Sequence, residues 1–328
     1  MRAIWYNRTG PASEVLTLGE FPTPVAAAGE VRVQLQASGV NPADTYRRQG
    51  LTPMEYPRVV PNSDGAGFVD QVGAGVSEKL LGKRVWLYNG QRNGRWCGTA
   101  AEFITLPPDL VTLLPDHVDF AAGATLGIPC MTAHRCLFVA GPVQGRTVLV
   151  TGGAGAVGHY AIQLAKWAGA AVIATVSSDA KAQRAKAAGA DAVIDYKRED
   201  AATRVAEITN GAGVDHVVEV DLGGNLAATL DAVRLNGSIA FYATSGNRTP
   251  TLPVRVLMQK NLAVHAVMLP TTPHEARRRA QSDIAAWLES GKRLLTVAGR
   301  YSLAETAAAH NAVERGDKIG TVVVEPHR

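Results

Sequence analysis

The stretch that decides the fold runs VLVTGGAGAVG, from Val148 to Gly158, and it joins a β-branched run to a helical pattern over residues 159–168. Gly153, Gly155 and Gly158 have the spacing G-x-G-x-x-G at the point where a strand turns into a helix. Glycines there permit a tight turn and let backbone N–H groups approach a pyrophosphate, whose charge the helix N-terminus favours. The motif predicts a dinucleotide site, with contacts from Gly153, Ala154, Gly155, Ala156, Val157 and Gly158.

The sequence on either side of this loop alternates short β-branched runs with Ala-rich helical patterns, which is typical of βαβ units on a parallel sheet. Six strands are predicted, at 148–151, 171–175, 192–194, 216–220, 238–242 and 263–267. Six such strands complete a Rossmann-type doubly wound parallel sheet. We therefore predict an α/β fold with a dinucleotide-binding domain over residues 125–266.

The remaining sequence predicts a second domain, as the length of 328 residues also suggests. Residues 1–124 contain short alternating segments, such as 31–35 and 84–87, separated by turn residues, which indicates a β-rich domain. The tail predicts helices at 273–290 and 303–315 and a final strand at 321–325. Because the six-stranded sheet is already complete, we expect residues 267–328 to return to the first domain.

The composition favours a cytoplasmic enzyme without a membrane anchor. Hydrophobic residues make up 46% and charged residues 19% of the chain, and no run approaches the roughly 18 uncharged apolar residues of a membrane span. The first six residues resemble a strand and not a signal peptide, and three cysteines without CxxC spacing suit a reducing compartment. The net charge is +4 and the chain has no long basic run, so the charge pattern does not indicate a nucleic-acid partner.

The end of the second predicted strand indicates which nicotinamide cofactor is bound. Enzymes that use NAD usually carry an Asp or Glu there for the ribose hydroxyls, whereas this chain has Ser177 and Ser178, with Lys181 on the next turn. Hydroxyls and a lysine suit a 2′-phosphate, so NADP(H) is the expected cofactor. Asp179 argues against this interpretation, and Lys181 could instead be an ordinary solvated helix residue.

Ordered motifs over nearly the whole chain resemble the quinone oxidoreductase (zeta-crystallin) family of the zinc-independent medium-chain dehydrogenase/reductase superfamily. These motifs are GVNPADTY at 39–46, SDGAG at 63–67, VGAGV at 72–76, GKRV at 82–85, GIP at 127–129 and AGA at 188–190. The resemblance implies a GroES-like catalytic domain completed by the C-terminal tail, and a homo-oligomer, commonly a dimer. It also implies that Lys181 and Tyr196 contact the adenosine 2′-phosphate, although Tyr196 could be only a half-buried aromatic residue after a strand.

The same resemblance implies that no catalytic metal is bound. Zinc-dependent members of the superfamily have Cys, His and usually Cys ligands where this chain has Asn41, Ser63 and Cys130 or a neighbour, and amide and hydroxyl groups bind zinc poorly. The structural zinc lobe is also missing, since residues 89–98 contain only Cys97. We interpret 89–96 as a polar loop, most simply a solvent-facing one.

Without a Lewis acid the acceptor should already be electron-poor, and a quinone fits. We expect hydride transfer from NADPH, with Asn41 and Tyr46 as hydrogen-bond donors to the developing oxyanion and Asp44 as an organiser of their loop. Asn41-Pro42 could also be only a turn. Residues expected to line the nicotinamide and its ribose are Gly127, Ile128, Thr132, Phe241, Tyr242, Ser245 and Gly246.

Two alternatives stay open. An activated C=C bond in an enone or alkenal would accept hydride from the same cofactor, and the sequence does not separate this reaction from quinone reduction. A remoter alternative is an RNA-binding or structural crystallin-like protein.

Overall fold

The structure, a computed structural model, describes residues 1–92, 94–291, 293–316 and 318–328. It contains two compact units, one formed by residues 1–128 with 288–328 and the other by residues 129–287. Each unit has its own sheet.

The second unit contains a six-stranded sheet in which every neighbouring pair is parallel. In chain order its strands are β8 (Thr147–Val150), β9 (Ala171–Val176), β10 (Ala192–Asp195), β11 (Val214–Glu219), β12 (Val233–Phe241) and β13 (Ala263–Ala266). Their spatial order is β10-β9-β8-β11-β12-β13, which is the doubly wound order of a Rossmann-type fold. The predicted six strands and fold class are confirmed.

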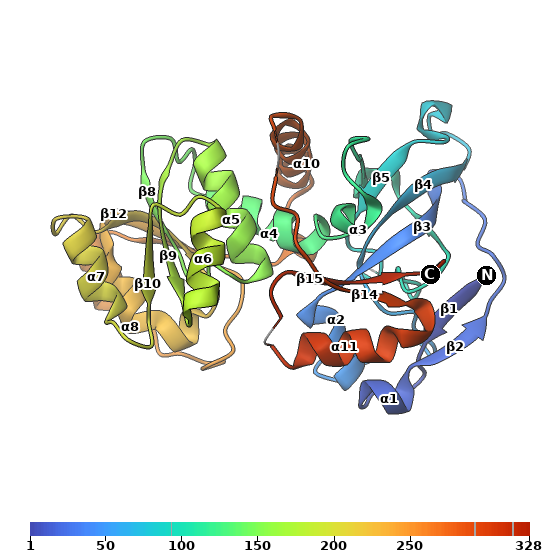
Figure 1. Cartoon of the computed structure of the whole chain (residues 1–328), viewed down its shortest axis with the longest axis horizontal. Helices are drawn as coiled ribbons and strands as arrows, with labels where there is room; N and C mark the ends of the chain where they lie inside the picture. Colours follow the sequence, from blue (N-terminus) through green and yellow to red (C-terminus); the bar gives the residue numbers. More distant parts are fainter. Residues whose placement is uncertain (93, 292, 317) are drawn as a thin grey trace. The chain divides into compact units, whose positions relative to one another are not determined.

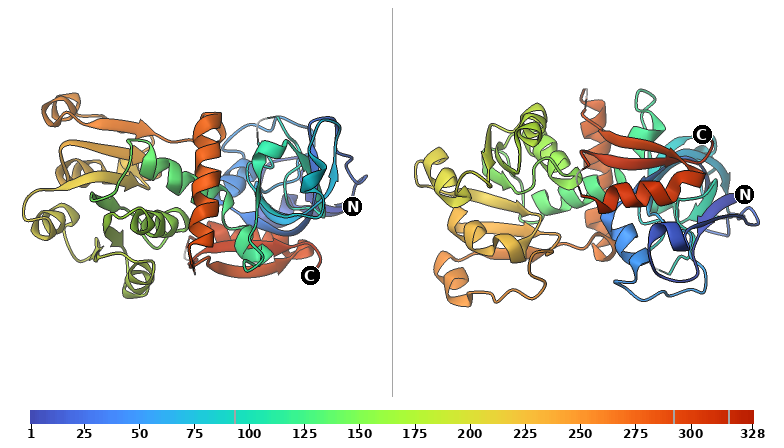
Figure 2. Two further views of the ribbon diagram at one scale, coloured as in Figure 1. Left: turned by 90° about the horizontal axis from the view of Figure 1, so that it is seen from above. Right: turned by 60° about the horizontal axis from the view of Figure 1, so that its bottom comes forward.

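Helices cover both faces of this sheet (Figures 1 and 2). On one face lie α5 (Ala156–Trp167) and α6 (Asp179–Ala187), and on the other lie α7 (Ala201–Ile208) and α8 (Leu222–Ala232). Val205, Leu222 and Leu230 from the second pair pack with Ile173 and Val217 of the sheet in one apolar cluster, to which α9 (Val254–Lys260) adds Leu257. Both faces of the sheet are covered and shielded from water, so the strands consist of nearly continuous runs of apolar residues.

The long helix α10 (His274–Glu289) belongs largely to this unit, which corrects the expected point of return to the first domain. We expected residues 267–328 to return, but residues 267–287 group with the second unit. The indole ring of Trp287 meets Tyr160 edge-on at 6.1 Å, and Asp283 Oδ2 lies 2.8 Å from His134 Nε2 on α4 (Gly127–Phe138). These contacts attach α10 to α5 and α4.

The first unit is β-rich, with a seven-stranded sheet in the order β14-β15-β3-β4-β5-β7 and with β6 also paired to β3. The strands are β3 (Val31–Val40), β4 (Asp64–Val72), β5 (Arg84–Leu87), β6 (Phe103–Leu106), β7 (Val111–Leu113), β14 (Val297–Ser302) and β15 (Thr321–Glu325). A hairpin of β1 (Arg2–Trp5) and β2 (Thr17–Glu20) lies beside it, and the helices are α1 (Ala12–Val15), α2 (Pro42–Gln49), α3 (Phe120–Gly123) and α11 (Thr306–Glu314).

The C-terminal tail completes this first sheet. Strand β15 pairs antiparallel with β3, so that Val323 lies opposite Gly39, and β14 pairs with β15. Val322 and Val324 then pack with Val40 and with α11 in one buried cluster. The expected return of the tail is therefore observed from residue 288 onward.

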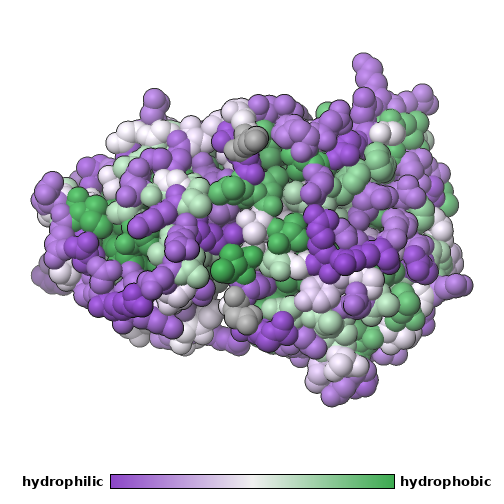
Figure 3. All heavy atoms as spheres, viewed as in Figure 1, coloured by the Kyte–Doolittle hydropathy of each residue, from purple (hydrophilic) through white to green (hydrophobic). Residues whose placement is uncertain are grey.

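Among the described residues no helix is long and apolar enough to cross a membrane. The face drawn in Figure 3 is mostly hydrophilic, with small separate apolar spots. Scattered exposed apolar residues of this kind are normal on a protein surface.

Candidate active site

The glycine loop lies between β8 and α5, at the edge of the sheet where dinucleotides bind in this fold. Gly158 lies so close to the loop that a Cβ there would be 2.4 Å from the Gly152 carbonyl oxygen, so only glycine lets α5 pack against the loop. Gly155 is exposed and precedes the first turn of α5, which no side chain caps. The N–H groups of Ala156 and Val157 therefore remain available to an anion.

The adenosine end of this site follows β9. Lys181 Nζ donates to Ser177 Oγ at 3.0 Å, and Ser178 Oγ accepts from Lys181 N at 3.4 Å at the start of α6. The structure thus brings together the three residues that the sequence predicted at a 2′-phosphate. All three are half-buried, so Lys181 is not simply a solvated helix residue.

Tyr196 lies on the adjacent turn, after β10. Its backbone N–H donates to the Val176 carbonyl at 3.1 Å, and its side chain is 54% exposed. Arg198, two residues further on, pairs with Asp179 at 2.9 Å. The carboxylate that argued against NADP(H) therefore has a cationic partner, which the sequence analysis missed.

Two carboxylates at the end of β11, Glu219 and Asp221, organise the segment that follows β12. Glu219 is fully buried, and its carboxylate accepts from the Thr151 and Thr229 hydroxyls, the Asn225 amide and the backbone N–H of Asp221. Asp221 in turn accepts from Ser245 N and Gly246 N, both at 2.9 Å. The predicted Ser245 and Gly246 are thus held in place by Asp221 beyond the carboxyl end of β11.

The other predicted nicotinamide contacts have different surroundings. Phe241 and Tyr242 are half-buried at the end of β12, and the Tyr242 N–H donates to the Glu219 carbonyl at 3.2 Å. Thr132 is buried on α4, with 6% of its surface exposed. These three residues belong to the second unit, whereas Gly127 and Ile128 group with the first.

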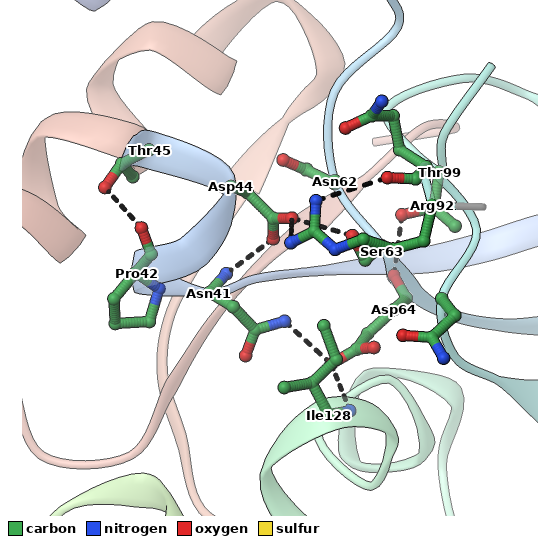
Figure 4. A network of polar contacts seen from close by, with 12 residues as sticks. Asn41, Pro42, Asp44, Thr45, Asn62, Ser63, Asp64, Arg92, Thr99 and Ile128 are labelled. Carbon is green, nitrogen blue, oxygen red and sulfur yellow. Dashed lines mark hydrogen bonds and ion pairs between the residues drawn. The ribbon is translucent and has the colours of Figure 1, made fainter. Parts of the chain in front are cut away.

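The predicted acceptor-binding residues lie at the start of α2 in the first unit. Asn41 is buried at the end of β3, and its backbone N–H donates to Asp44 Oδ2 at 2.9 Å (Figure 4). Asp44 Oδ1 also accepts from Ser63 Oγ at 2.8 Å and from Arg92 Nη2 at 3.3 Å. Asp44 therefore links the start of α2 to Ser63 and Arg92, whereas the Tyr46 side chain is 47% exposed.

Asp64 is the centre of this cluster and was absent from the predicted site. Its Oδ2 accepts from Asn41 Nδ2 at 2.7 Å and from Ile128 N at 2.8 Å at the start of α4. A Cβ on Gly127 would lie 2.2 Å from Asp64 Cγ, so Gly127 makes room for this carboxyl group. Burial, reinforced by the charge of Asp44, raises the pKa of Asp64 well above its usual value. Gly127 and Ile128 thus contact the Asn41 cluster, which consists of Asn41, Asp44, Ser63, Asp64 and Arg92.

The polar loop after β5 is not a solvent loop. Asn89, Gln91 and Arg92 are all buried, and Arg95 Nη2 donates to the Asn89 carbonyl at 2.6 Å. Asn93, which belonged to the predicted loop, lies outside the described residues. Within the loop, Arg92 pairs with the buried Asp44 at 3.3 Å.

The predicted residues fit a dinucleotide but do not fit zinc. The glycine loop, the uncapped start of α5 and the Lys181 ammonium group suit pyrophosphate and phosphate groups. By contrast, Asn41 Nδ2 and Ser63 Oγ already donate to Asp64 and Asp44, and burial raises the pKa of the Cys130 thiol well above its usual value. A protonated thiol, an amide and a hydroxyl are poor zinc ligands.

Some of the missed residues had a signal in the sequence. Glu219 and Asp221 are acidic residues at the carboxyl end of a predicted strand, which is where ligands bind in open parallel sheets. Arg92 and Arg198 had none, because their partners Asp44 and Asp179 are distant in the sequence.

The fold and these residues define a nicotinamide-dinucleotide oxidoreductase with a β-rich domain and a Rossmann-type domain. Family models support both parts: residues 27–116 match the alcohol dehydrogenase GroES-like domain, and residues 156–285 match the model named zinc-binding dehydrogenase. The expected GroES-like character of the first domain is thereby confirmed.

Known proteins resemble the chain over nearly its whole length. Quinone oxidoreductase from Pseudomonas aeruginosa is 31% identical over 95% of this chain and 96% of its own. The 2-haloacrylate reductase of a Burkholderia species is 31% identical over 99% of both chains. The structure of Escherichia coli quinone oxidoreductase in complex with NADPH superposes with a TM-score of 0.86 at 28% identity, over 99% of this chain and 100% of that one. The chain belongs to the quinone oxidoreductase family of the medium-chain dehydrogenase/reductase superfamily.

Proposed function

We propose that this protein is an NADPH-dependent quinone reductase that works without zinc. The observation that carries the proposal is the Lys181 ammonium group, held 3.0 Å from the Ser177 hydroxyl at the end of β9. An enzyme selective for NAD usually places a carboxylate there, which a 2′-phosphate would repel. The NADPH complex of the Escherichia coli relative supports the same choice of cofactor.

Each part of the second unit would hold one part of NADPH. The N–H groups at the start of α5 would bind the pyrophosphate, while Ser177, Ser178, Lys181 and Tyr196 would surround the 2′-phosphate. Residues 241–246, fixed by Glu219 and Asp221, would contact the nicotinamide half. NADPH supplies a hydride which, with one proton from solvent, reduces a quinone to a hydroquinone.

The Asn41 cluster would stabilise the reduced acceptor. One Asn41 N–H is donated to Asp64, and the second amide N–H would bind the oxygen that gains negative charge. Burial raises the pKa of Asp64, which favours the uncharged form of its carboxyl group, and Oδ2 accepts the N–H groups of both Asn41 and Ile128. A neutral Asp64 keeps negative charge away from the developing oxyanion. Tyr46, which is exposed on α2, would be a second hydrogen-bond donor to the same oxygen.

Reduction of an activated C=C bond is the second candidate function. The relative named 2-haloacrylate reductase is as similar to this chain as the quinone oxidoreductases are. The same donors would stabilise an enolate.

A panel of acceptors separates the two reactions. The metal-free protein would be mixed with NADPH and, in separate assays, with 1,4-benzoquinone, methyl vinyl ketone or 2-chloroacrylate. The loss of the reduced-nicotinamide absorbance gives the rate for each acceptor. We expect kcat/KM to be highest for the quinone. A higher value for either alkene would replace quinone reduction by C=C reduction.

We also propose that the protein forms a homodimer and acts in the cytoplasm. Strand β13 is at the edge of the six-stranded sheet, and the neighbouring Val254, Met258 and Met268 are 60%, 75% and 64% exposed. A sheet edge flanked by exposed apolar side chains suits pairing with a second copy. Cys97, Cys130 and Cys136 are free thiols, which suits a reducing compartment.

A further inference from the structure

The turns after β9 and β10 lie next to each other and carry charges of both signs. The Tyr196 N–H donates to the Val176 carbonyl, which joins the turns through their backbones. Arg198 joins them again through side chains, since its Nη1 donates to Asp179 Oδ1 at 2.9 Å and its Nη2 lies 3.5 Å from Oδ2. Its Nε also lies 3.5 Å from Asp195 Oδ2.

The position of Asp179 makes this ion pair important for cofactor choice. Asp179 is the first residue of α6, directly after Ser178 and two residues before Lys181. It is 77% exposed, so its carboxylate is accessible to a bound nucleotide. A carboxylate at this end of the second strand accepts hydrogen bonds from ribose hydroxyls and repels a 2′-phosphate. Alone, Asp179 would favour NADH and would oppose Lys181.

We propose that Arg198 determines the preference for NADPH by neutralising Asp179. The inference rests on the proposed NADPH site, and it assigns to Arg198 a role separate from direct phosphate binding by Lys181. The 2′-phosphate carries a charge between −1 and −2 near neutral pH by analogy with other phosphomonoesters, whereas NADH has only a neutral hydroxyl there. Loss of Arg198 should therefore weaken NADPH binding selectively.

The test is a double-mutant cycle read by direct binding. Arg198→Gln, Asp179→Asn and the double variant would be titrated with NADPH and with NADH, following nicotinamide fluorescence. We expect Arg198→Gln to raise the Kd for NADPH about tenfold, which corresponds to about 1.4 kcal/mol, and not to raise the Kd for NADH, since the freed Asp179 carboxylate can accept from the ribose hydroxyls. In the Asp179→Asn background, the same replacement should change the Kd for NADPH less than about twofold.

Arg234→Gln is the matched control, because Arg234 is an exposed arginine that pairs with Asp215 at 2.6 Å near the amino ends of the strands. It should leave both Kd values unchanged. Equal binding of NADPH by Arg198→Gln and wild type would overturn the inference. A loss that persists in the Asp179→Asn background would overturn it too, because Arg198 would then contact the phosphate directly. If the wild-type protein itself shows no preference for NADPH, the proposed function fails instead.

Discussion

The side-chain amide of Asn41 donates to Asp64 Oδ2 at 2.7 Å, and this bond connects the end of β3 to the start of β4. Ile128 N donates to the same oxygen, so Asp64 fixes the Asn41 amide and the first turn of α4 together. The orientation of Asn41 is therefore set by a buried group and not by solvent.

Asn41→Ala should lower kcat/KM for 1,4-benzoquinone about tenfold, because one hydrogen bond to the developing oxyanion is lost. The Kd for NADPH should stay within about twofold of wild type. Steady-state kinetics and a nucleotide titration measure both values. Asn7→Ala, at an exposed position, is the control. An unchanged kcat/KM would remove Asn41 from the proposed mechanism.

Lys181→Gln should raise the Kd for NADPH about 10- to 100-fold, since a charge-assisted hydrogen bond contributes about 1.5–3 kcal/mol. The Kd for NADH should hardly change, because NADH lacks the 2′-phosphate. Isothermal titration calorimetry with both nucleotides checks this. Equal weakening of NADPH and NADH would mean that Lys181 supports the fold of the site and does not bind the phosphate.

Gly158→Ala should reduce the free energy of unfolding by about 1–3 kcal/mol, because the added Cβ would lie 2.4 Å from the Gly152 carbonyl oxygen. Gly155→Ala is the matched control. Its Cβ would meet only the same oxygen at 3.2 Å, so its stability should remain close to that of wild type. Urea unfolding without nucleotide compares the two variants. Equal stabilities would show that α5 does not approach the loop so closely.

Two buried histidines should make stability depend on pH. Burial lowers the pKa of His216 to about 4 and that of His310 to about 3. The unfolded chain, with histidine pKa values of about 6.5, binds protons that the folded protein does not, so stability is lost as pH falls from about 6.5 toward these values. At about pH 5.5, each histidine should lower the free energy of unfolding by roughly 1 kcal/mol.

Urea unfolding at several pH values measures this slope, and His216→Asn should reduce it. The exposed His117, changed in the same way, is the control. A slope of the opposite sign between about pH 6.5 and 5 would contradict the assignment of buried neutral imidazoles.

Met258→Glu should weaken the proposed dimer, because Met258 is 75% exposed on α9, close to the edge strand β13. A charge placed in an apolar interface costs several kcal/mol when it has no partner. Sedimentation velocity at several concentrations would show a monomer for the variant and a dimer for the wild type. A monomeric wild-type protein would refute the dimer proposal.

The sequence predicted the parts of the site that depend on local patterns. Local patterns predicted the VLVTGGAGAVG loop, the six strands and the grouping of Ser177, Ser178 and Lys181. In each case strand, turn and helix are consecutive in the chain. The sequence predicted helix α10 but not the helices that it packs against, because contacts such as that of Trp287 with Tyr160 join segments that are distant in the sequence. For the same reason the burial of Arg92 and the pairing of Arg198 escaped prediction: a single charged residue in a polar stretch gives no sign of its partner.

The central claim is that NADPH binds the second unit and that its hydride passes to a quinone. The most direct measurement is a single-turnover experiment in which metal-free protein, loaded with one equivalent of NADPH, is mixed with 1,4-benzoquinone. We predict loss of the reduced-nicotinamide absorbance with one hydroquinone formed for each NADPH, and a much slower reaction when the protein is omitted. Tight NADPH binding with oxidation no faster than in the absence of protein would contradict the account.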